Sequence, residues 1–163
     1  KRQAKGARRT DEDFLEVRNI EVAAKIYHSK ELGVYVPSTW VMAALDSISW
    51  KHYKISKADI RGGVVAQDLR LKLNYKNSKK VTCGEDIVGN DYFRHLMLLK
   101  QGQVKVAKAF PIFHEWSFHI TLDFDDTVVD RGTLADMLQR AAKYGGFGDF
   151  RPTFGTAEAI IEA

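Results

Sequence analysis

Four aspartates stand close together ahead of a predicted helix, and their carboxylates could bind a divalent cation. They are Asp123, Asp125, Asp126 and Asp130, and carboxylate oxygens are the hard ligands that Ca²⁺ prefers. Their spacing does not match an EF-hand loop. A helix that begins just after them explains the acidic residues, because its dipole favours negative charge at its N-terminus. We therefore interpret them as a turn and a helix start, and we predict no metal site.

One histidine carries a pattern found in the two-histidine phosphoesterases. His119-Ile120-Thr121 matches their H-x-T element, in which the histidine transfers a proton. That chemistry needs two such elements, one with a basic and one with an acidic histidine. The other four histidines do not begin a second H-x-T or H-x-S element. His119 also alternates with an apolar face, so we favour a solvent-facing strand residue.

The single cysteine limits the redox and metal chemistry that the chain can perform. Cys83 alone excludes an intrachain disulfide framework and a multi-cysteine zinc site. A reducing, intracellular setting fits it best. The sequence also contains no P-loop, no G-x-S-x-G element and no Cys–His dyad by spacing. We predict no catalytic residue and no cofactor.

A glycine-rich loop at residues 145–155 is the segment most indicative of function. One glycine is enough to end a helix, so further glycines indicate positive φ angles or a close approach of the backbone to something else. Basic and aromatic residues are interleaved with them, which suits a single strand with stacked bases. The competing interpretation is a compact turn whose phenylalanines fill the core. The candidate contacts are Lys143, Gly146, Phe147, Gly148 and Arg151.

Two further groups of basic residues are candidates for contact with a nucleic-acid backbone. Residues 68–76 alternate between apolar and polar, which predicts a strand with one buried and one solvated face. The solvated face is basic. A second basic cluster follows a predicted helix, beside Trp50, which is a candidate for stacking on a base. The candidate contacts in the two groups are Lys51, Lys54, Arg61, Arg70 and Lys72.

The overall composition permits a nucleic-acid partner without requiring one. The chain of 163 residues suits one domain, and its net charge of +4 is mild. No apolar run approaches the ~20 residues that span a bilayer, so we predict no membrane partner.

The order of predicted elements indicates an α+β fold. Thr10 to Asp13 and Thr133 to Asp136 each match a capping box, and Ser38 or Thr39 can begin the middle helix. We predict helices at 11–29, from 39 onward and at 133–144, and strands at 34–36, 68–76, 95–99, 104–109, 116–124 and 156–162. We expect a basic flexible tail at 1–10 and one domain at 11–163, with an insertion around 77–110. The chain opens on Lys1 rather than Met, which leaves open that it starts inside a longer product or that the numbering passes over residues.

The order of strand, helix, glycine-rich loop and strand resembles the end of a ferredoxin-like domain in the RAMP superfamily. This superfamily contains the CRISPR effector backbone subunits and crRNA-processing proteins. Val34–Leu45 is similar to its segment of extended chain, Ile-Pro, small polar residues and helix. Phe113–Trp116 and Gly146–Pro152 resemble uncharacterised phage proteins. The chain departs from the family in two places: the usual glycine after Pro37-Ser38 is absent, and no first strand is evident before Phe14.

The resemblance implies a ferredoxin-like (RRM-like) antiparallel sheet with helices on one face. It implies a non-enzymatic, phage-encoded protein in the bacterial host cytoplasm that binds single-stranded nucleic acid, with RNA favoured over DNA. It also implies self-assembly into a homo-oligomer or filament. Two alternatives stay open: a protein-interaction module that mimics a CRISPR backbone subunit, and a metal-dependent RNA endonuclease that uses a single aspartate. No feature of the sequence selects one among Asp46, Asp59 and Asp68.

Overall fold

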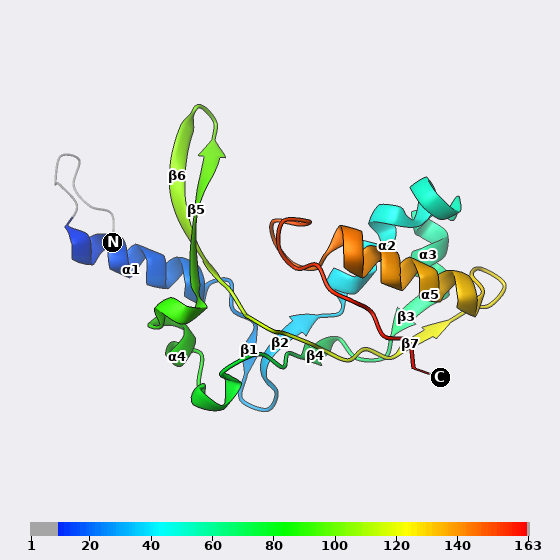
Figure 1. The fold of residues 1–163 in the computed structure, drawn as a ribbon, viewed down its shortest axis with the longest axis horizontal. Coiled ribbons are helices and arrows are strands. Elements are labelled where there is room, and N and C mark those ends of the chain that lie inside the picture. The colour runs from blue at the N-terminus through cyan, green and yellow to red at the C-terminus, as the bar shows by residue number, and fades with distance from the viewer. Residues whose placement is uncertain (1–9, 163) are drawn as a thin grey trace. The chain divides into compact units, whose positions relative to one another are not determined.

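The computed structural model describes residues 10–162, which form a mixed α+β structure (Figure 1). The α-helices are α1 (Asp11–Ala23), α2 (Thr39–Ile48), α3 (Lys57–Gly63), α4 (Glu85–Val88) and α5 (Arg131–Arg140). The strands are β1 (His28–Ser29), β2 (Gly33–Pro37), β3 (Val64–Ala66), β4 (Arg70–Lys72), β5 (Arg94–Gln101), β6 (Val104–Pro111) and β7 (Leu122–Phe124). Two π-helical turns, η1 (Ser49–Tyr53) and η4 (Ala141–Gly145), follow α2 and α5, and two 3₁₀ turns are η2 (Ser78–Lys80) and η3 (Asp91–Phe93). The strands form three small sheets of order β1-β2-β4, β3-β7 and β5-β6. The predicted α+β class is confirmed.

The chain groups into two compact units, where the sequence predicted one domain. Unit 1 contains the chain up to Tyr35 and Lys72–Phe118, and unit 2 contains Val36–Leu71 and the chain from His119 onward. The chain therefore leaves unit 1 within β2, returns within β4 and leaves again after Phe118. The insertion predicted around 77–110 lies wholly inside unit 1. Of the predicted tail at 1–10, only Thr10 lies among the described residues.

Unit 1 is built from α1, α4 and the β5–β6 hairpin. Thr10 caps α1 as predicted, because its hydroxyl accepts from the Asp13 N–H while the Asp13 carboxylate accepts from the Thr10 N–H. The helix ends at Ala23 rather than at the predicted residue 29, because His28 and Ser29 form β1 and pair with β2. The hairpin extends the two predicted strands to eight residues each. Figure 1 shows it as a long twisted ribbon beside α1.

Glu21 fastens α1 to the base of the hairpin. Its carboxylate accepts from the Lys108 ammonium and from the backbone N–H of Ala109, both at 2.8 Å. Lys25 donates in turn to the Ala109 carbonyl at 2.7 Å and lies over the Phe110 ring. Burial opposes the charged form of Glu21, but these hydrogen bonds and cations outweigh it and hold the pKa of Glu21 below its ordinary value. The same contacts make the helix–hairpin junction sensitive to acid.

Unit 2 has a core between α2, α3 and α5, with β3 at its edge. Its buried members are Ala44, Leu45, Ile48, Ile60, Val64, Val129, Leu134, Met137 and Ala141. The predicted apolar stripes of α2 and α5 both supply this core. β3 pairs with β7 in an antiparallel register that places Val65 opposite Asp123. Asp130, not Thr133, caps α5, because its carboxylate accepts from both the N–H and the hydroxyl of Thr133.

Three predicted strands are shorter or unpaired in the structure. Within 68–76 only Arg70–Lys72 forms strand, although Leu71, Leu73 and Tyr75 are buried as predicted and Leu69 is not. Within 116–124 only Leu122–Phe124 forms strand. Residues 156–162 have no regular secondary structure and join no sheet among the described residues. The first two segments still pair locally, because Asn74 and Ser117 form an isolated antiparallel bridge with both N–H groups donating across it.

Replacing Glu21 with Gln is expected to lower stability by about 1–2 kcal/mol at pH 7, because hydrogen bonds to a charged partner are lost. The folded-state pKa is depressed, so this contribution is complete above the unfolded pKa of about 4.3 and disappears as pH falls through the folded pKa. Urea unfolding at pH 7 and pH 3 measures the difference. The Glu16→Gln variant, changed on the exposed part of the same helix, is the control. A stability difference that is the same at both pH values would contradict the assignment.

Candidate nucleic-acid interface

The glycine-rich loop closes on itself in unit 2. Gly146 ends the π-helical turn η4 and donates its N–H to the Ala141 carbonyl at 2.8 Å. The N–H of Phe147 then donates to the Gly155 carbonyl at 2.9 Å, which joins the two ends of the loop. The N–H of Ala157 donates to the Ala142 carbonyl at 3.1 Å, so the chain after the loop lies beside η4. Figure 1 shows the loop in red, after α5.

The loop's own packing explains its glycines. A methyl group at Gly155 would lie 1.9 Å from the Phe147 carbonyl oxygen, and one at Gly146 would lie 3.0 Å from the Phe154 carbonyl oxygen. At Gly148 the same group would lie 3.0 Å from the Trp40 ring. All three glycines also have positive φ angles, which disfavour other residues. The pattern that indicated a close approach is therefore accounted for within the protein.

Phe147 packs against the core of unit 2, whereas the two cations of the loop face solvent. The Phe147 side chain is half-buried beside the core residues of α2 and α5. Lys143 and Arg151 are exposed. The structure therefore favours the compact-turn interpretation for Gly146, Phe147 and Gly148. It leaves Lys143 and Arg151 placed for contact with a ligand.

The basic cluster after α2 is arranged around an exposed tryptophan. Trp50 lies in η1 with 60% of its surface exposed, and the Lys54 ammonium lies 5.9 Å from the centre of its ring. Lys51 is exposed in the same turn. Lys54 ends the turn with a left-handed backbone, φ 62°. A tryptophan face beside an ammonium group provides both a stacking surface and a phosphate contact.

A hydrogen-bonded chain fixes this turn against α5. The Tyr53 hydroxyl donates to the Asp136 carboxylate at 2.5 Å, and Arg140 Nε donates to the same hydroxyl at 3.1 Å. Burial and the hydrogen bond to Asp136 raise the pKa of Tyr53, so its hydroxyl keeps its proton at neutral pH. These contacts hold the backbone that carries Trp50.

Arg61 is held in an ion pair with Asp46. Its Nε and Nη2 both donate to Asp46 Oδ2, at 2.8 and 2.5 Å. The Asp46 side chain is 11% exposed, while that of Arg61 is 66% exposed. The second carboxylate oxygen of Asp46 is buried and has no hydrogen-bond partner among the described residues. Asp46 is thus an acid on α2 that anchors α3, and Arg61 is partly neutralised before any ligand arrives.

Arg70 and Lys72 are exposed on β4, on either side of the buried Leu71. The alternation predicted for this strand is confirmed there. Arg70 belongs to unit 2 and Lys72 to unit 1. The structure therefore places nine of the ten predicted contacts in unit 2.

The net positive charge of the chain comes from its first nine residues. Residues 1–9 hold five Lys or Arg and no acid, whereas residues 10–162 hold twenty basic and twenty-one acidic side chains. Unit 2 contains nine basic and eleven acidic side chains. The candidate contact residues of unit 2 are therefore local cations on a nearly neutral body.

The other groups with possible chemistry make local hydrogen bonds. Asp125 and Asp130 accept hydrogen bonds from Thr127 and Thr133, which lower the pKa of both carboxyls, in agreement with their interpretation as turn and helix-start residues. His119 is exposed, with its ring nitrogen 3.5 Å from the Thr121 hydroxyl. Among residues 10–162, no three His, Cys, Asp or Glu side chains gather in a geometry that could hold a metal ion.

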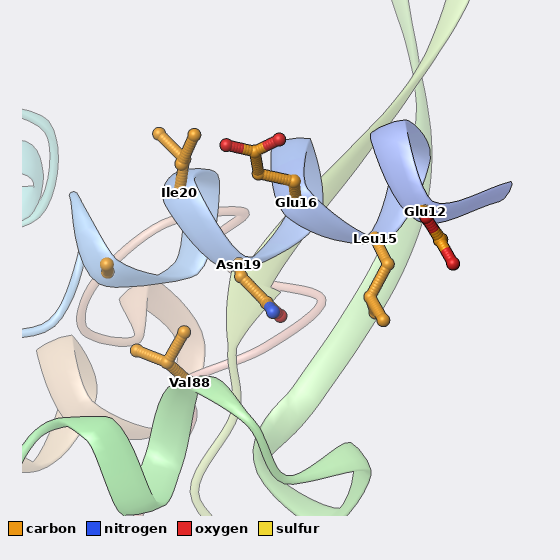
Figure 2. A pocket seen from close by; sticks show the side chains of 7 residues that line it. Glu12, Leu15, Glu16, Asn19, Ile20 and Val88 are labelled. Carbon is orange, nitrogen blue, oxygen red and sulfur yellow. The ribbon is translucent and has the colours of Figure 1, made fainter. Parts of the chain in front are cut away.

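Unit 1 contains an apolar groove between α1 and α4 that the sequence did not reveal. Its volume is about 450 Å³, and its lining residues are Glu12, Leu15, Glu16, Asn19, Ile20, Ala23 and Val88. Figure 2 shows Val88 pointing toward α1, with Leu15 and Asn19 projecting from the helix on the side of α4. Glu12 and Glu16 place negative charge along the same helix. The groove therefore presents an apolar floor beside acidic side chains.

Comparisons with known proteins identify no relative, since no family model, curated protein or solved structure matches the chain. In the described part of the chain, no helix is both long enough and apolar enough to cross a bilayer.

Replacing Gly155 with Ala is expected to lower stability by about 2–4 kcal/mol, because the new methyl group overlaps the Phe147 carbonyl and the backbone has positive φ. Thermal unfolding followed by circular dichroism measures the change. Gly62→Ala is the matched control, since a methyl group there meets nothing within 4 Å and the residue lies in α3. Equal stability of the two variants would show that the loop does not close as described.

Proposed function

We propose that the protein binds single-stranded nucleic acid, with RNA favoured over DNA, and catalyses no reaction on it. The observation that carries this proposal is the exposed Trp50, with Lys51 and Lys54 beside it on a turn that is fixed to α5. A base stacked on an aromatic side chain contributes about 1–3 kcal/mol and needs no particular sequence. The neighbouring ammonium groups of Lys51 and Lys54 would contact phosphates next to that base.

The fixed geometry of the turn favours binding. A backbone already held in position loses less conformational entropy when a ligand arrives than a mobile one does. The Tyr53–Asp136–Arg140 hydrogen bonds supply that restraint. Trp50 itself leaves a large apolar face in water, and a stacked base would cover it.

The balanced charge of unit 2 sets the expected salt dependence. Each phosphate neutralised on a single strand contributes a slope of about −0.7 to a plot of log K against log salt. The few exposed cations of the interface therefore give a shallow slope. Stacking, which depends little on salt, contributes a correspondingly large share of the affinity.

We also propose that unit 2 is a ferredoxin-like (RRM-like) domain related to the RAMP superfamily, in a phage-encoded protein of the bacterial host cytoplasm. The antiparallel β3–β7 pair and the packing of α2 and α5 on one core support this relation. Residues 156–162 follow α5 along the chain, where the family has its last strand. The glycine-rich loop stands between them, in the order that the resemblance implies.

Self-assembly is the second part of the proposal, and it uses unit 1. One face of the β5–β6 hairpin carries the exposed Leu96 and Leu98 beside the cross-strand pair Lys100–Lys105. This combination of leucines and lysines complements an apolar groove with acidic sides. The hairpin of one copy would then occupy the α1–α4 groove of the next, a head-to-tail contact that forms rings or filaments.

The same groove supports the alternative function of a protein-interaction module. An apolar groove beside Glu12 and Glu16 would equally accept an apolar segment flanked by basic residues from another protein. The two functions differ in the partner, and self-association of the purified protein distinguishes them.

A Lys143→Ala, Arg151→Ala double variant is expected to bind a single-stranded RNA oligonucleotide more weakly, with a salt slope shallower by about 1.4, because two phosphate contacts are lost. Fluorescence anisotropy at several salt concentrations measures both quantities. Lys79→Ala, Lys80→Ala removes two exposed charges of unit 1 and is the matched control. Unchanged binding in the first variant would remove the loop from the interface. Cleavage of the labelled RNA in the presence of Mg²⁺ would instead favour the endonuclease alternative.

A Leu98→Glu variant is expected to weaken self-association at least tenfold, because it places a carboxylate where a leucine meets an acidic groove. Sedimentation velocity over a range of concentrations measures the association. Val104→Glu is the control, since Val104 is similarly exposed on the opposite face of the hairpin. A parent protein that stays monomeric at all concentrations would contradict self-assembly and favour a different protein as the occupant of the groove.

A further inference from the structure

A second exposed aromatic residue lies beside a lysine in unit 2. Tyr144 has 63% of its surface exposed, and the Lys143 ammonium lies 5.5 Å from the centre of its ring. The sequence indicated only that a helix ends near this residue. In the structure Tyr144 belongs to η4, the π-helical turn that extends α5 as far as Gly145.

The packing of η4 against α2 brings Tyr144 near the tryptophan site. A methyl group at Gly145 would lie 3.8 Å from the Ser47 hydroxyl oxygen, so the residue after Tyr144 adjoins Ser47. Ser47 is exposed and lies three residues before Trp50, which places the two on one side of the helix. The turn that carries Tyr144 therefore adjoins Ser47 near the end of α2, and the turn that carries Trp50 follows α2 directly.

The two aromatic sites share the same construction. Trp50 lies in the π-helical turn after α2, and Tyr144 lies in the π-helical turn after α5. Each has a lysine beside its ring, Lys54 in one case and Lys143 in the other. Wide turns of this kind occur frequently at functional sites.

A single exposed aromatic residue is ordinary on a protein surface and needs no explanation. Two of them, each with an ammonium group beside the ring and both anchored around Ser47, form a more specific arrangement. Each ring would stack one base of a single strand, and the lysine beside each ring would contact a neighbouring phosphate.

We propose that Tyr144 is a second base-stacking residue, so that a single strand crosses α2 at Ser47 with bases on Trp50 and Tyr144. This inference rests on the proposed function, because it assigns a further contact in the same interface. The ligand class is a single-stranded oligonucleotide of at least two stacked bases, recognised without regard to base identity.

The test uses the full chain and a fluorescent twelve-nucleotide oligo-dT or oligo-U. Tyr144→Ala is expected to weaken binding about 5- to 100-fold, since one stacked base is lost. Tyr144→Phe keeps the ring and is expected to bind within about twofold of the parent. Val65→Ala, which shortens an exposed side chain on β3 of the same unit, is expected to leave binding unchanged.

A double-mutant cycle separates stacking from a structural effect. When abasic sites replace the bases of the oligonucleotide, the Tyr144→Ala and Trp50→Ala penalties are both expected to disappear. A Tyr144→Ala penalty that persists on the abasic strand would overturn the inference, because it would then reflect altered protein structure.

The same measurements distinguish failure of this inference from failure of the proposed function. If the parent binds and Trp50→Ala weakens it while Tyr144→Ala does not, Tyr144 is not a stacking residue and the proposed function stands. If the parent binds neither oligonucleotide, the proposed function fails and this inference fails with it.

Discussion

The packing of α2 against α5 is the contact on which the candidate interface depends. Leu45 and Met137 are fully buried where the two helices share a core. Each helix then continues into a π-helical turn, and those turns carry the exposed aromatic residues Trp50 and Tyr144. Loss of the helix packing would therefore separate both halves of the interface at once. The Tyr53–Asp136 hydrogen bond strengthens the same junction from its polar side.

Local sequence patterns predicted the helices of this protein better than its strands. The Thr10–Asp13 capping box and the apolar stripes of α2 and α5 depend on neighbouring residues alone, and all three are confirmed. The segments 116–124 and 156–162 alternate as strands do, but a strand also needs a partner edge, which lies far away in the sequence. Short α3 was missed because Lys57–Gly63 ends in two glycines and reads as a loop.

The candidate interface was predicted in part. The sequence identified exposed cations correctly, because long charged side chains rarely lie buried without a partner. It did not show that Arg61 is held by Asp46, since that pair joins two helices. Glycines at 146, 148 and 155 suggest a ligand in the sequence, because the sequence does not show their neighbours, which are the loop's own backbone and Trp40. Tyr144 carries no pattern of its own, and only the structure reveals its exposure.

The discontinuity of unit 2 has a consequence for synthesis on the ribosome. Val36–Leu71 emerges first, but its core partners belong to the segment after His119. Leu45 therefore cannot pack against Met137 until about ninety more residues have been synthesised. At about 5–20 residues per second, the apolar stripe of α2 remains without its partner for roughly 5–20 seconds. Meanwhile Lys72–Phe118 can complete unit 1 with the earlier chain. Folding of the two units is therefore ordered in time, and the nascent chain exposes the stripe of α2 to chaperones during that interval.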